Sequence, residues 1–395
     1  AGKELAQIAM SKVFREGDFR SGYYRDQTFM MAIGQMSIRQ MFAGLYGHTD
    51  LELEPSSGGR QMSGHYASRT LNDDGTWKNL MEMKNSSADV SCTASQMPRL
   101  LGLAQASKIY RKNKLLKDWN SFSDNGNELA FGTIGDSSTS EGLFFETINA
   151  AGVLQVPMIM SVWDDGYGIS VPSKYQTTKE SISEVLNGFQ RDEDNAGYEI
   201  FRVKGWDYPS LIETYQKAEK IAREEHVPCL IHVTEMTQPQ GHSTSGSHER
   251  YKSKNRLQWE ADFDPIKKMG EWIVQTGISS QEDIDLIMSE AKKTVRLQKA
   301  DAWNAYINPI KQEQQQVLSL MVKIADDSPN KVFIEKLVND LSGYNEPSRK
   351  DVFYAARKCL RLARNDQSSI KSNLSAWVKK EKEINTNRYS SHLYS

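Results

Sequence analysis

A strand–helix–strand pattern in the middle of the chain constrains the fold more than any other feature. An apolar run over residues 129–134 ends at Asp136, and a second apolar run over residues 156–162 ends at Asp165. Residues 141–154 between them have the composition of a helix. Strand, helix and strand in so short a segment indicate a βαβ unit, with parallel strands and a right-handed crossover.

Each of these two strands carries an acidic residue to the same edge of the predicted sheet. Open α/β sheets bind ligands outside the carboxyl ends of their strands, so we expect Asp136 and Asp165 to face a ligand. Ser137 and Ser138 follow Asp136 and precede the helix, whose free N–H groups suit an anionic phosphate. Carboxylate oxygens beside such an anion are typical ligands of Mg²⁺. The segment therefore predicts Mg²⁺ bridging the chain and a phosphorylated ligand.

The segment from Gly135 to Ser170 resembles the thiamine diphosphate motif of 2-oxoacid dehydrogenases, in the alpha subunit of the decarboxylating first component. The resemblance implies that Asp136, Asp165 and the backbone carbonyl of Tyr167 bind Mg²⁺. Two positions depart from the family pattern, because Ser137 replaces the last Gly of a Gly-Asp-Gly triplet and an Asp pair replaces an Asn pair. Asp165 keeps a ligand oxygen and adds a negative charge, so we expect an Asp165→Asn change to be tolerated.

Three further segments resemble the same family. Tyr24-Arg25-Asp26 is similar to a Tyr-Arg-Glu whose Arg holds the diphosphate, a task that suits a planar guanidinium. Gly59-Arg60-Gln61-Met62-Ser63-Gly64-His65-Tyr66 is similar to a loop whose His approaches the reacting end of the cofactor. Ser91-Cys92-Thr93 begins a segment similar to one that hydrogen-bonds the aminopyrimidine through Ser91 and the backbone of Thr93. The resemblance thus assigns Tyr24, Arg25, Ser91 and Thr93 to cofactor binding and His65 to catalysis.

The loop Gln240-Gly241-His242-Ser243-Thr244-Ser245-Gly246-Ser247 resembles the family loop that closes over the diphosphate and the lipoyl channel. The resemblance implies a cofactor-binding and catalytic role for His242, and imidazole changes protonation near neutral pH. Its Gly, Ser and Thr content is typical of a mobile segment. Family members often place two arginines near the diphosphate, and this chain has Gln238 to Gln240 and Trp163 at those places.

The chain is expected to divide into two domains. Residues 1–298 alternate helix and strand patterns, which predicts an α/β fold with a doubly wound, mostly parallel sheet of the thiamine diphosphate-binding type. Helical spacing runs through residues 264–299. Residues 299–395 are highly charged and predict a C-terminal helical extension, interpreted as a linker toward a beta half farther along a longer natural chain.

The resemblance implies an activity as well as a fold. We expect oxidative decarboxylation of a 2-oxoacid, with a 2-oxoisovalerate-type substrate as the first choice and pyruvate as the second. The cofactors would be thiamine diphosphate and Mg²⁺, and the acyl group would pass to a lipoyl-bearing acyltransferase. A beta half or subunit would supply the Glu that activates the cofactor, in a homodimer or heterotetramer, so the isolated chain is expected to be inactive.

Composition agrees with this interpretation and narrows the alternatives. A net charge of −2 indicates neither a nucleic acid nor a membrane partner, and no apolar run approaches the ~20 residues of a membrane span. The cysteines Cys92, Cys229 and Cys359 lack metal-ligand spacing and are typical of a cytoplasmic protein. Three alternatives stay open: an acetoin-cleaving relative, a Mg²⁺-dependent phosphohydrolase using Asp136 and Asp165, and a non-catalytic scaffold half.

Overall fold

The computed structural model describes residues 2–61, 64–239, 241–242 and 247–390, and the chain divides into two units. Unit 1 comprises Ala1–Ser37, Pro55–Ser57 and Ser63–Lys292; unit 2 comprises Ile38–Glu54, Gly58–Met62 and Lys293–Ser395. The sequence predicted one division after residue 298. The structure differs in adding two short segments from the N-terminal part of the chain to the helical unit, because their contacts lie there.

Unit 1 is built on a six-stranded parallel sheet, which confirms the predicted doubly wound α/β fold. Its strands, in spatial order, are β2 (Asn85–Ser86), β1 (Phe19–Ser21), β3 (Ala130–Gly135), β4 (Met158–Trp163), β8 (Cys229–Thr234) and β7 (Glu199–Lys204). Every neighbouring pair is parallel. The chain adds β2 on one side of β1 and β3 on the other, so the strand order reverses there. Sheets of this kind bind ligands at such a switch point.

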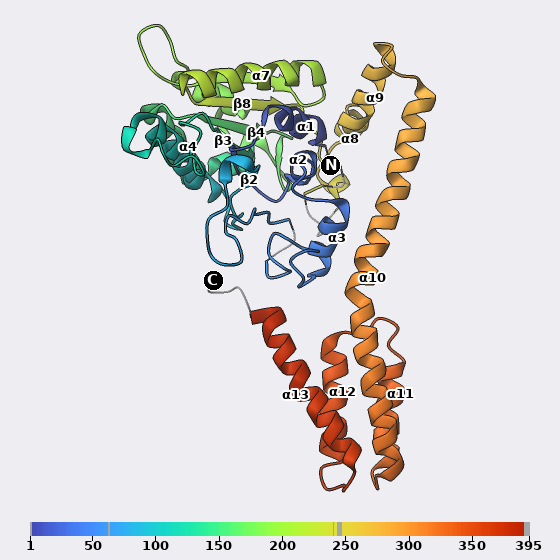
Figure 1. Ribbon diagram of the computed structural model, residues 1–395. Helices are drawn as coiled ribbons and strands as arrows, with labels where there is room; N and C mark the ends of the chain where they lie inside the picture. Colours follow the sequence, from blue (N-terminus) through green and yellow to red (C-terminus); the bar gives the residue numbers. More distant parts are fainter. Residues whose placement is uncertain (1, 62–63, 240, 243–246, 391–395) are drawn as a thin grey trace. The chain divides into compact units, whose positions relative to one another are not determined.

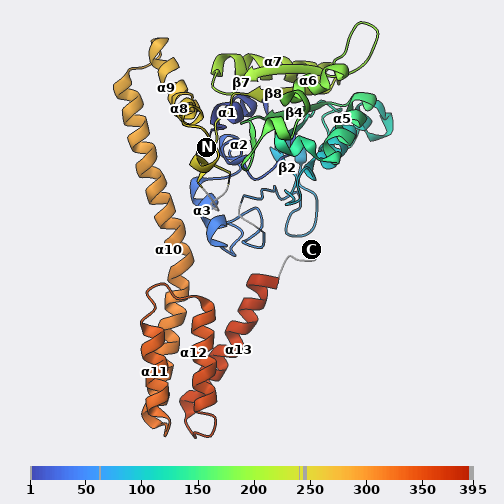
Figure 2. The same ribbon diagram turned by 180° about the vertical axis from the view of Figure 1, so that it is seen from behind.

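Helices cover both faces of this sheet (Figures 1 and 2). The helices α1 (Glu4–Val13), α2 (Gln27–Ala32) and α7 (Tyr208–Glu225) share one hydrophobic cluster with the strands. The helices α4 (Gln96–Lys112) and α5 (Gly142–Leu154) share a second cluster with the opposite strand faces. The two clusters make unit 1 a three-layer structure, with the sheet in the middle.

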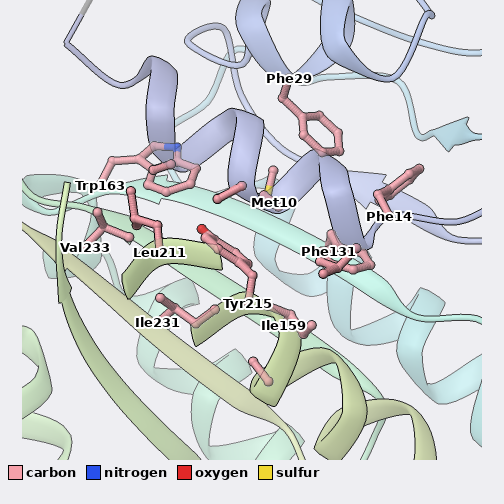
Figure 3. Packing of buried hydrophobic residues seen from close by; sticks show 14 of the residues in the cluster. Met10, Phe14, Phe29, Phe131, Ile159, Trp163, Leu211, Tyr215, Ile231 and Val233 are labelled. Atoms are coloured by element: carbon pink, nitrogen blue, oxygen red, sulfur yellow. The ribbon is translucent and has the colours of Figure 1, made fainter. Parts of the chain in front are cut away.

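Alternate residues of the central strands supply the two clusters. Phe131, Ile159 and Val233 pack toward α1 and α7, and Figure 3 shows their side chains converging on Met10 and Tyr215. The residues that alternate with these along the strands point to the other face, and a parallel strand buried on both faces reads as a nearly continuous apolar run. Residues on that other face include Ala130, Met158, Met160 and Leu230. Trp163 is completely buried in the first cluster, so it serves as a core residue.

Shorter elements complete unit 1. They are the hairpin β5 (Tyr167–Gly168) and β6 (Val171–Pro172), the helices α6 (Ile182–Val185), α8 (Lys254–Asp262) and α9 (Pro265–Gln275), and the 3₁₀ turns η1 (Leu80–Glu82), η2 (Lys114–Leu116), η3 (Ser137–Ser140), η4 (Ser173–Tyr175), η5 (Thr178–Glu180), η6 (Leu186–Phe189) and η7 (His248–Arg250). The helical spacing predicted over residues 264–299 is interrupted after α9. Gly277 there has a φ of 71°, a left-handed conformation that ends a helix, and the next helix begins at Gln281.

Unit 2 is a helical bundle with a core of its own. Its core residues come from the C-terminal part of α10 (Gln281–Asp327) and from α11 (Lys331–Ser342), α12 (Arg349–Leu362) and α13 (Ser369–Ser390). The helix α3 (Ile38–Tyr46) joins this unit through the ring of Tyr46, whose centroid lies 5.0 Å from that of Trp303. Among the described residues, none of the helices is both long and apolar enough to cross a membrane.

Candidate functional site

The segments singled out in the sequence follow the carboxyl ends of five strands in unit 1. Arg25 comes after β1, Ser91 after β2, Asp136 after β3, Asp165 after β4 and His242 after β8. Carboxyl ends of parallel strands lie at one edge of a sheet, so the topology brings these five segments to the edge with the switch point. The candidate site is this edge.

Two buried carboxylates form the centre of the site. Asp136 is 6% exposed and Asp165 is 3% exposed. Oδ2 of Asp136 and Oδ1 of Asp165 are buried without a hydrogen-bond partner among the described residues. Burial raises the pKa of Asp136 well above its usual range, and the charges of Asp165 and Asp164 raise it further. Two such oxygens in one buried place are an arrangement that a bound cation would relieve.

A lysine that the sequence analysis did not single out contacts one of these acids. The ammonium of Lys3, buried at 3% exposure, donates to Oδ2 of Asp165 over 2.9 Å. Burial alone would raise the pKa of Asp165, but Lys3 and His242 outweigh burial and hold that pKa below its usual range. The sequence did contain one signal for such a cation. Asp165 stands where the family has Asn, and an additional buried charge needs a counter-charge.

Asp164, the other half of the Asp pair, takes part in a hydrogen-bonded chain with His232 and Ser183. His232 contacts Oδ2 of Asp164 through Nε2 at 2.8 Å, and its Nδ1 lies 2.8 Å from the hydroxyl of Ser183. The other carboxylate oxygen of Asp164 accepts the N–H of Gly166 over 2.9 Å. Gly166 has a φ of 80°, which favours glycine. This hydrogen-bonded chain therefore fixes the turn that carries Asp165 and Tyr167.

His242 and Arg25 lie together beside Asp165. His242 Nε2 is 3.4 Å from Oδ2 of Asp165, and a guanidinium nitrogen of Arg25 donates to the carbonyl of His242 over 3.4 Å. The side-chain amide of Gln238 donates to the carbonyl of Gly241 over 2.8 Å, so the start of this loop is held by the segment that follows β8. The remaining loop positions named in the sequence, Gln240 and residues 243–246, lie outside the described residues.

The other predicted catalytic histidine meets a predicted cofactor residue. His65 Nε2 lies 2.9 Å from the hydroxyl of Ser91, although the two are far apart in the sequence. Thr93 is exposed close by in the chain. Arg60, from the first half of the same sequence motif, belongs to unit 2 and donates to the carbonyl of Arg388. Met62 and Ser63 lie outside the described residues.

The remaining predicted site residues line the same edge. Tyr24 is 48% exposed, and the Arg25 guanidinium lies 4.9 Å from its ring centroid. Ser137 packs against Gly168, where an added Cβ would come within 2.7 Å of the serine Cβ. Ser138 accepts the N–H of Glu141 through its carbonyl.

Cations surround Tyr167 although two family arginines are absent. Lys252 Nζ lies 5.3 Å from the Tyr167 ring centroid, and the Arg256 guanidinium lies 5.5 Å from it. Arg256 also donates to the backbone carbonyl of Asp165 over 2.7 Å. Lys252 and Arg256 both contact Glu260, which balances part of their charge.

A second buried cation, Arg20, links the chain segments that carry the site residues. Arg20 in β1 is completely buried, and its guanidinium contacts Asp26 at 2.7 Å and Asp89 at 3.0 Å. Asp89 also accepts the N–H of Tyr66 over 3.0 Å, and Asp26 accepts the hydroxyl of Thr133 over 2.6 Å. Sequence reasoning missed Arg20, because one arginine in a short strand reads as an exposed residue. It ties β1 to the chain segments that carry Arg25, His65 and Ser91.

The donor set at the acid pair fits a magnesium ion held with a phosphorylated cofactor. The part of the chain that the structure describes contains no group of three or more His, Cys, Asp or Glu that could hold a metal alone. Two carboxylates and a backbone carbonyl, completed by phosphate oxygens and water, match Mg²⁺, which seldom has an all-protein cage. The two unpartnered carboxylate oxygens supply the hard ligands.

Comparison with known proteins finds relatives that are named as alpha subunits of dehydrogenases. A 2-oxoisovalerate dehydrogenase subunit alpha of Bacillus subtilis is 27% identical over 306 residues, covering 77% of this chain and 81% of that protein. A mitochondrial 2-oxoisovalerate dehydrogenase subunit alpha 1 of Arabidopsis thaliana is 28% identical over 249 residues, 62% of this chain and 45% of that protein. A 3-methyl-2-oxobutanoate dehydrogenase subunit alpha of Mycobacterium tuberculosis is 31% identical over 170 residues, 43% of this chain and 44% of that protein.

The chain spans less than half the length of the last two relatives. The family model for the dehydrogenase E1 component matches residues 1–311, which include every predicted site residue. The chain therefore belongs to the dehydrogenase E1 component family, whose members are oxidoreductases that depend on thiamine diphosphate.

Proposed function

We propose that this chain is the alpha half of a 2-oxoacid dehydrogenase that decarboxylates a 2-oxoisovalerate-type substrate and passes the acyl group to a lipoyl carrier. The observation that carries the proposal is a pair of buried oxygens on Asp136 and Asp165, at the switch-point edge, that have no hydrogen-bond partner among residues 2–61, 64–239, 241–242 and 247–390. His242 and the His65–Ser91 pair lie at the same edge. Relatives named for 2-oxoisovalerate support the substrate class, and pyruvate is the second choice.

The proposal gives each site residue a binding role. Asp136, Asp165 and the carbonyl of Tyr167 would hold Mg²⁺, whose charge would join them to a diphosphate. Diphosphate oxygens would be bound by cationic and hydrogen-bonding groups: Tyr24, Arg25, Ser137, Ser138 and His242. Ser91 and the backbone of Thr93 would hold the aminopyrimidine end. Arginine is suited to this work because its planar fork pairs two phosphate oxygens at once.

The histidines would handle protons. When bound, thiamine diphosphate supplies the electron sink that makes the loss of CO₂ from a 2-oxoacid possible. His65, whose ring is oriented by the Ser91 hydroxyl 2.9 Å from Nε2, would bind the substrate oxygen through an imidazole N–H that is not engaged by Ser91. His242 would exchange a proton at Nε2, the nitrogen that faces Asp165 at 3.4 Å. Substrate in this site would meet two imidazoles held by different strand ends.

Partners follow from the division of labour in such an enzyme. A beta half or subunit would supply the carboxylate that activates the aminopyrimidine, and a lipoyl-bearing acyltransferase would accept the acyl group. The chain by itself is then expected to show no decarboxylation. Adding the beta half would restore cofactor binding and turnover together, because both depend on one interface.

Calorimetric titration of thiamine diphosphate in the presence of Mg²⁺ and the beta half tests the proposal. Asp136→Ala removes one of the two carboxylate ligands, and we expect cofactor affinity to fall about 100-fold or more. Asp194→Ala, which removes an exposed acid from a loop, is the control and leaves affinity unchanged. Equal affinity of Asp136→Ala and wild type would overturn the assignment. Release of CO₂ from 2-oxoisovalerate and from pyruvate then ranks the two substrates.

A further inference from the structure

The ammonium of Lys3 occupies a complete hydrogen-bonding site. A lysine side chain carries three N–H donors and no acceptor. Lys3 Nζ lies 2.9 Å from Oδ2 of Asp165, 2.7 Å from Oε1 of Gln238 and 3.3 Å from the carbonyl of Thr237. The three donors thus meet three acceptors in a place where the side chain is 4% exposed. A lysine is almost never buried in this way unless it is paired.

The backbone before Lys3 is shaped to reach this place. Gly2 has a φ of 86°, and a Cβ added there would lie 1.9 Å from the carbonyl oxygen of Thr237. Only glycine allows so close an approach of two backbones in a left-handed conformation. The segment is therefore seated against the loop that follows β8, and Lys3 enters the site from there.

The contact leaves Asp165 with one used and one unused oxygen. Oδ2 of Asp165 is engaged by Lys3, and His242 lies beside it, whereas Oδ1 is buried with no hydrogen-bond partner in the part of the chain that the structure describes. With both carboxyl groups ionised, as metal ligands are, the formal charges of Lys3, Asp165 and Asp136 sum to −1. An asparagine at position 165, without the lysine, would give the same net charge and the same single free oxygen.

We propose that Lys3 is a resident counter-cation of the candidate metal site, which makes Asp165 act toward a divalent cation as an asparagine would. This inference rests on the proposed function, because that function places Mg²⁺ between Asp136 and Asp165. Lys3 is a positioning residue that acts through Asp165 and does not touch the metal. The chain thus compensates the extra negative charge of Asp165 with a cation in direct contact with it.

The ion pair changes the expectation for Asp165→Asn. From the sequence alone, that substitution was expected to be tolerated. With Lys3 in place, it leaves a buried ammonium without its carboxylate and makes the net charge of the three side chains zero. Such a site would bind Mg²⁺ more weakly than the wild-type site does. The substitution is expected to be tolerated only when Lys3 is also neutralised.

A double-mutant cycle on the full chain tests the inference, with Mg²⁺ alone as the calorimetric probe. The variants are Lys3→Gln, Asp165→Asn and the double variant, and Lys12→Gln at an exposed lysine of α1 is the matched control. The charge count predicts that Lys3→Gln binds Mg²⁺ about tenfold more tightly than wild type and Asp165→Asn about tenfold more weakly. The double variant and the control bind as wild type does.

This order of Mg²⁺ affinities distinguishes a counter-cation from a lysine with a purely structural role. Loss of a merely structural contact would weaken Mg²⁺ binding in Lys3→Gln, or leave it unchanged, and that result overturns the inference. If Lys3→Gln does not fold, the double variant and Asp165→Asn still differ about tenfold under the proposal. Equal Mg²⁺ affinity of those two also overturns it.

The same samples separate this inference from the proposed function. Wild-type chain that binds thiamine diphosphate with the beta half, but shows the wrong order of Mg²⁺ affinities, contradicts only the role of Lys3. The predicted order without any binding of thiamine diphosphate supports the counter-cation and contradicts the proposed function.

Discussion

Two buried clusters, each of one cation and two carboxylates, lie at the carboxyl edge of the same sheet. They are the Arg20 cluster, with Asp26 and Asp89, and the Lys3 cluster, with Asp165 and Asp136. Both have a net charge of −1, but only in the first does the cation contact both acids. Among the described residues, the Lys3 cluster has an oxygen without a hydrogen-bond partner on each of its two acids, whereas the Arg20 cluster has one such oxygen, Oδ1 of Asp26. The Arg20 guanidinium pairs with both of its acids and is structural, whereas the Lys3 ammonium pairs with Asp165 and leaves the second cluster able to bind a cation.

The largest expected effect on stability comes from removing the cation of the Arg20 cluster. Arg20→Met leaves Asp26 and Asp89 buried without their cation, and breaking a buried ion pair in this way costs about 3–5 kcal/mol. We expect the free energy of unfolding, from urea denaturation, to fall by that amount. Arg202→Met is the control, because its side chain is 58% exposed and its ion pair with Glu184 is at the surface. If Arg20→Met lowered the free energy of unfolding by as little as Arg202→Met does, the Arg20 cluster would not be a structural element of the site.

The same substitution in the two clusters is expected to have opposite signs. Asp89→Asn weakens charge-assisted hydrogen bonds to Arg20 and costs about 2–3 kcal/mol. Asp136→Asn replaces a buried carboxyl group whose pKa is raised by burial. At pH 7 and without a divalent cation, we expect the free energy of unfolding to rise by about 1–2 kcal/mol. Denaturation of both variants in the presence of a chelator measures the two signs. Destabilisation of comparable size in both would make the Lys3 cluster structural as well.

The smallest effect concerns a buried group away from both clusters. Burial lowers the pKa of His226 to about 4, below its ordinary value of 6.5, and its Nε2 contacts the carbonyl of Gly126 at 2.9 Å. Since the folded pKa lies below the unfolded one, this contribution to stability is complete above pH 6.5 and is lost as the pH falls toward 4.

The slope from this histidine is at most about 1.4 kcal/mol per pH unit. Comparing wild type with His226→Gln by thermal unfolding between pH 7 and pH 4 isolates it. Parallel pH profiles of the two proteins would contradict the shift. If the stability of wild type falls relative to that of His226→Gln as the pH is lowered from 7 to 4, the burial of His226 is the cause, because the ion clusters are the same in both proteins.

How much of this molecule could be predicted depended on distance along the chain. The strands β3 and β4 were evident because burial on both faces makes them apolar along their length. Asp136 and Asp165 were evident because each follows such a strand, whereas the segments with Arg25, His65, Ser91 and His242 were found only through the family resemblance. The Lys3–Asp165 contact could not be foreseen, because 162 positions separate the two residues and a lysine before a helix reads as exposed.

The helical unit shows the same limit. A helical extension over residues 299–395 was predicted from its highly charged composition, but the inclusion of α3 in this unit was not. That inclusion depends on aromatic contacts such as Tyr46 with Trp303, which no local pattern reveals. Long-range packing decides which segments form one unit, whereas periodicity reports only on each segment by itself.

A crystal structure of the chain with its beta half, Mg²⁺ and thiamine diphosphate tests the central claim most directly. We predict a metal about 2.1 Å from one oxygen each of Asp136 and Asp165 and from the Tyr167 carbonyl. The ammonium of Lys3 is expected to remain on the other oxygen of Asp165, at about the 2.9 Å seen here. Cofactor bound elsewhere, or a metal gripping both oxygens of Asp165 with Lys3 displaced, would contradict the claim.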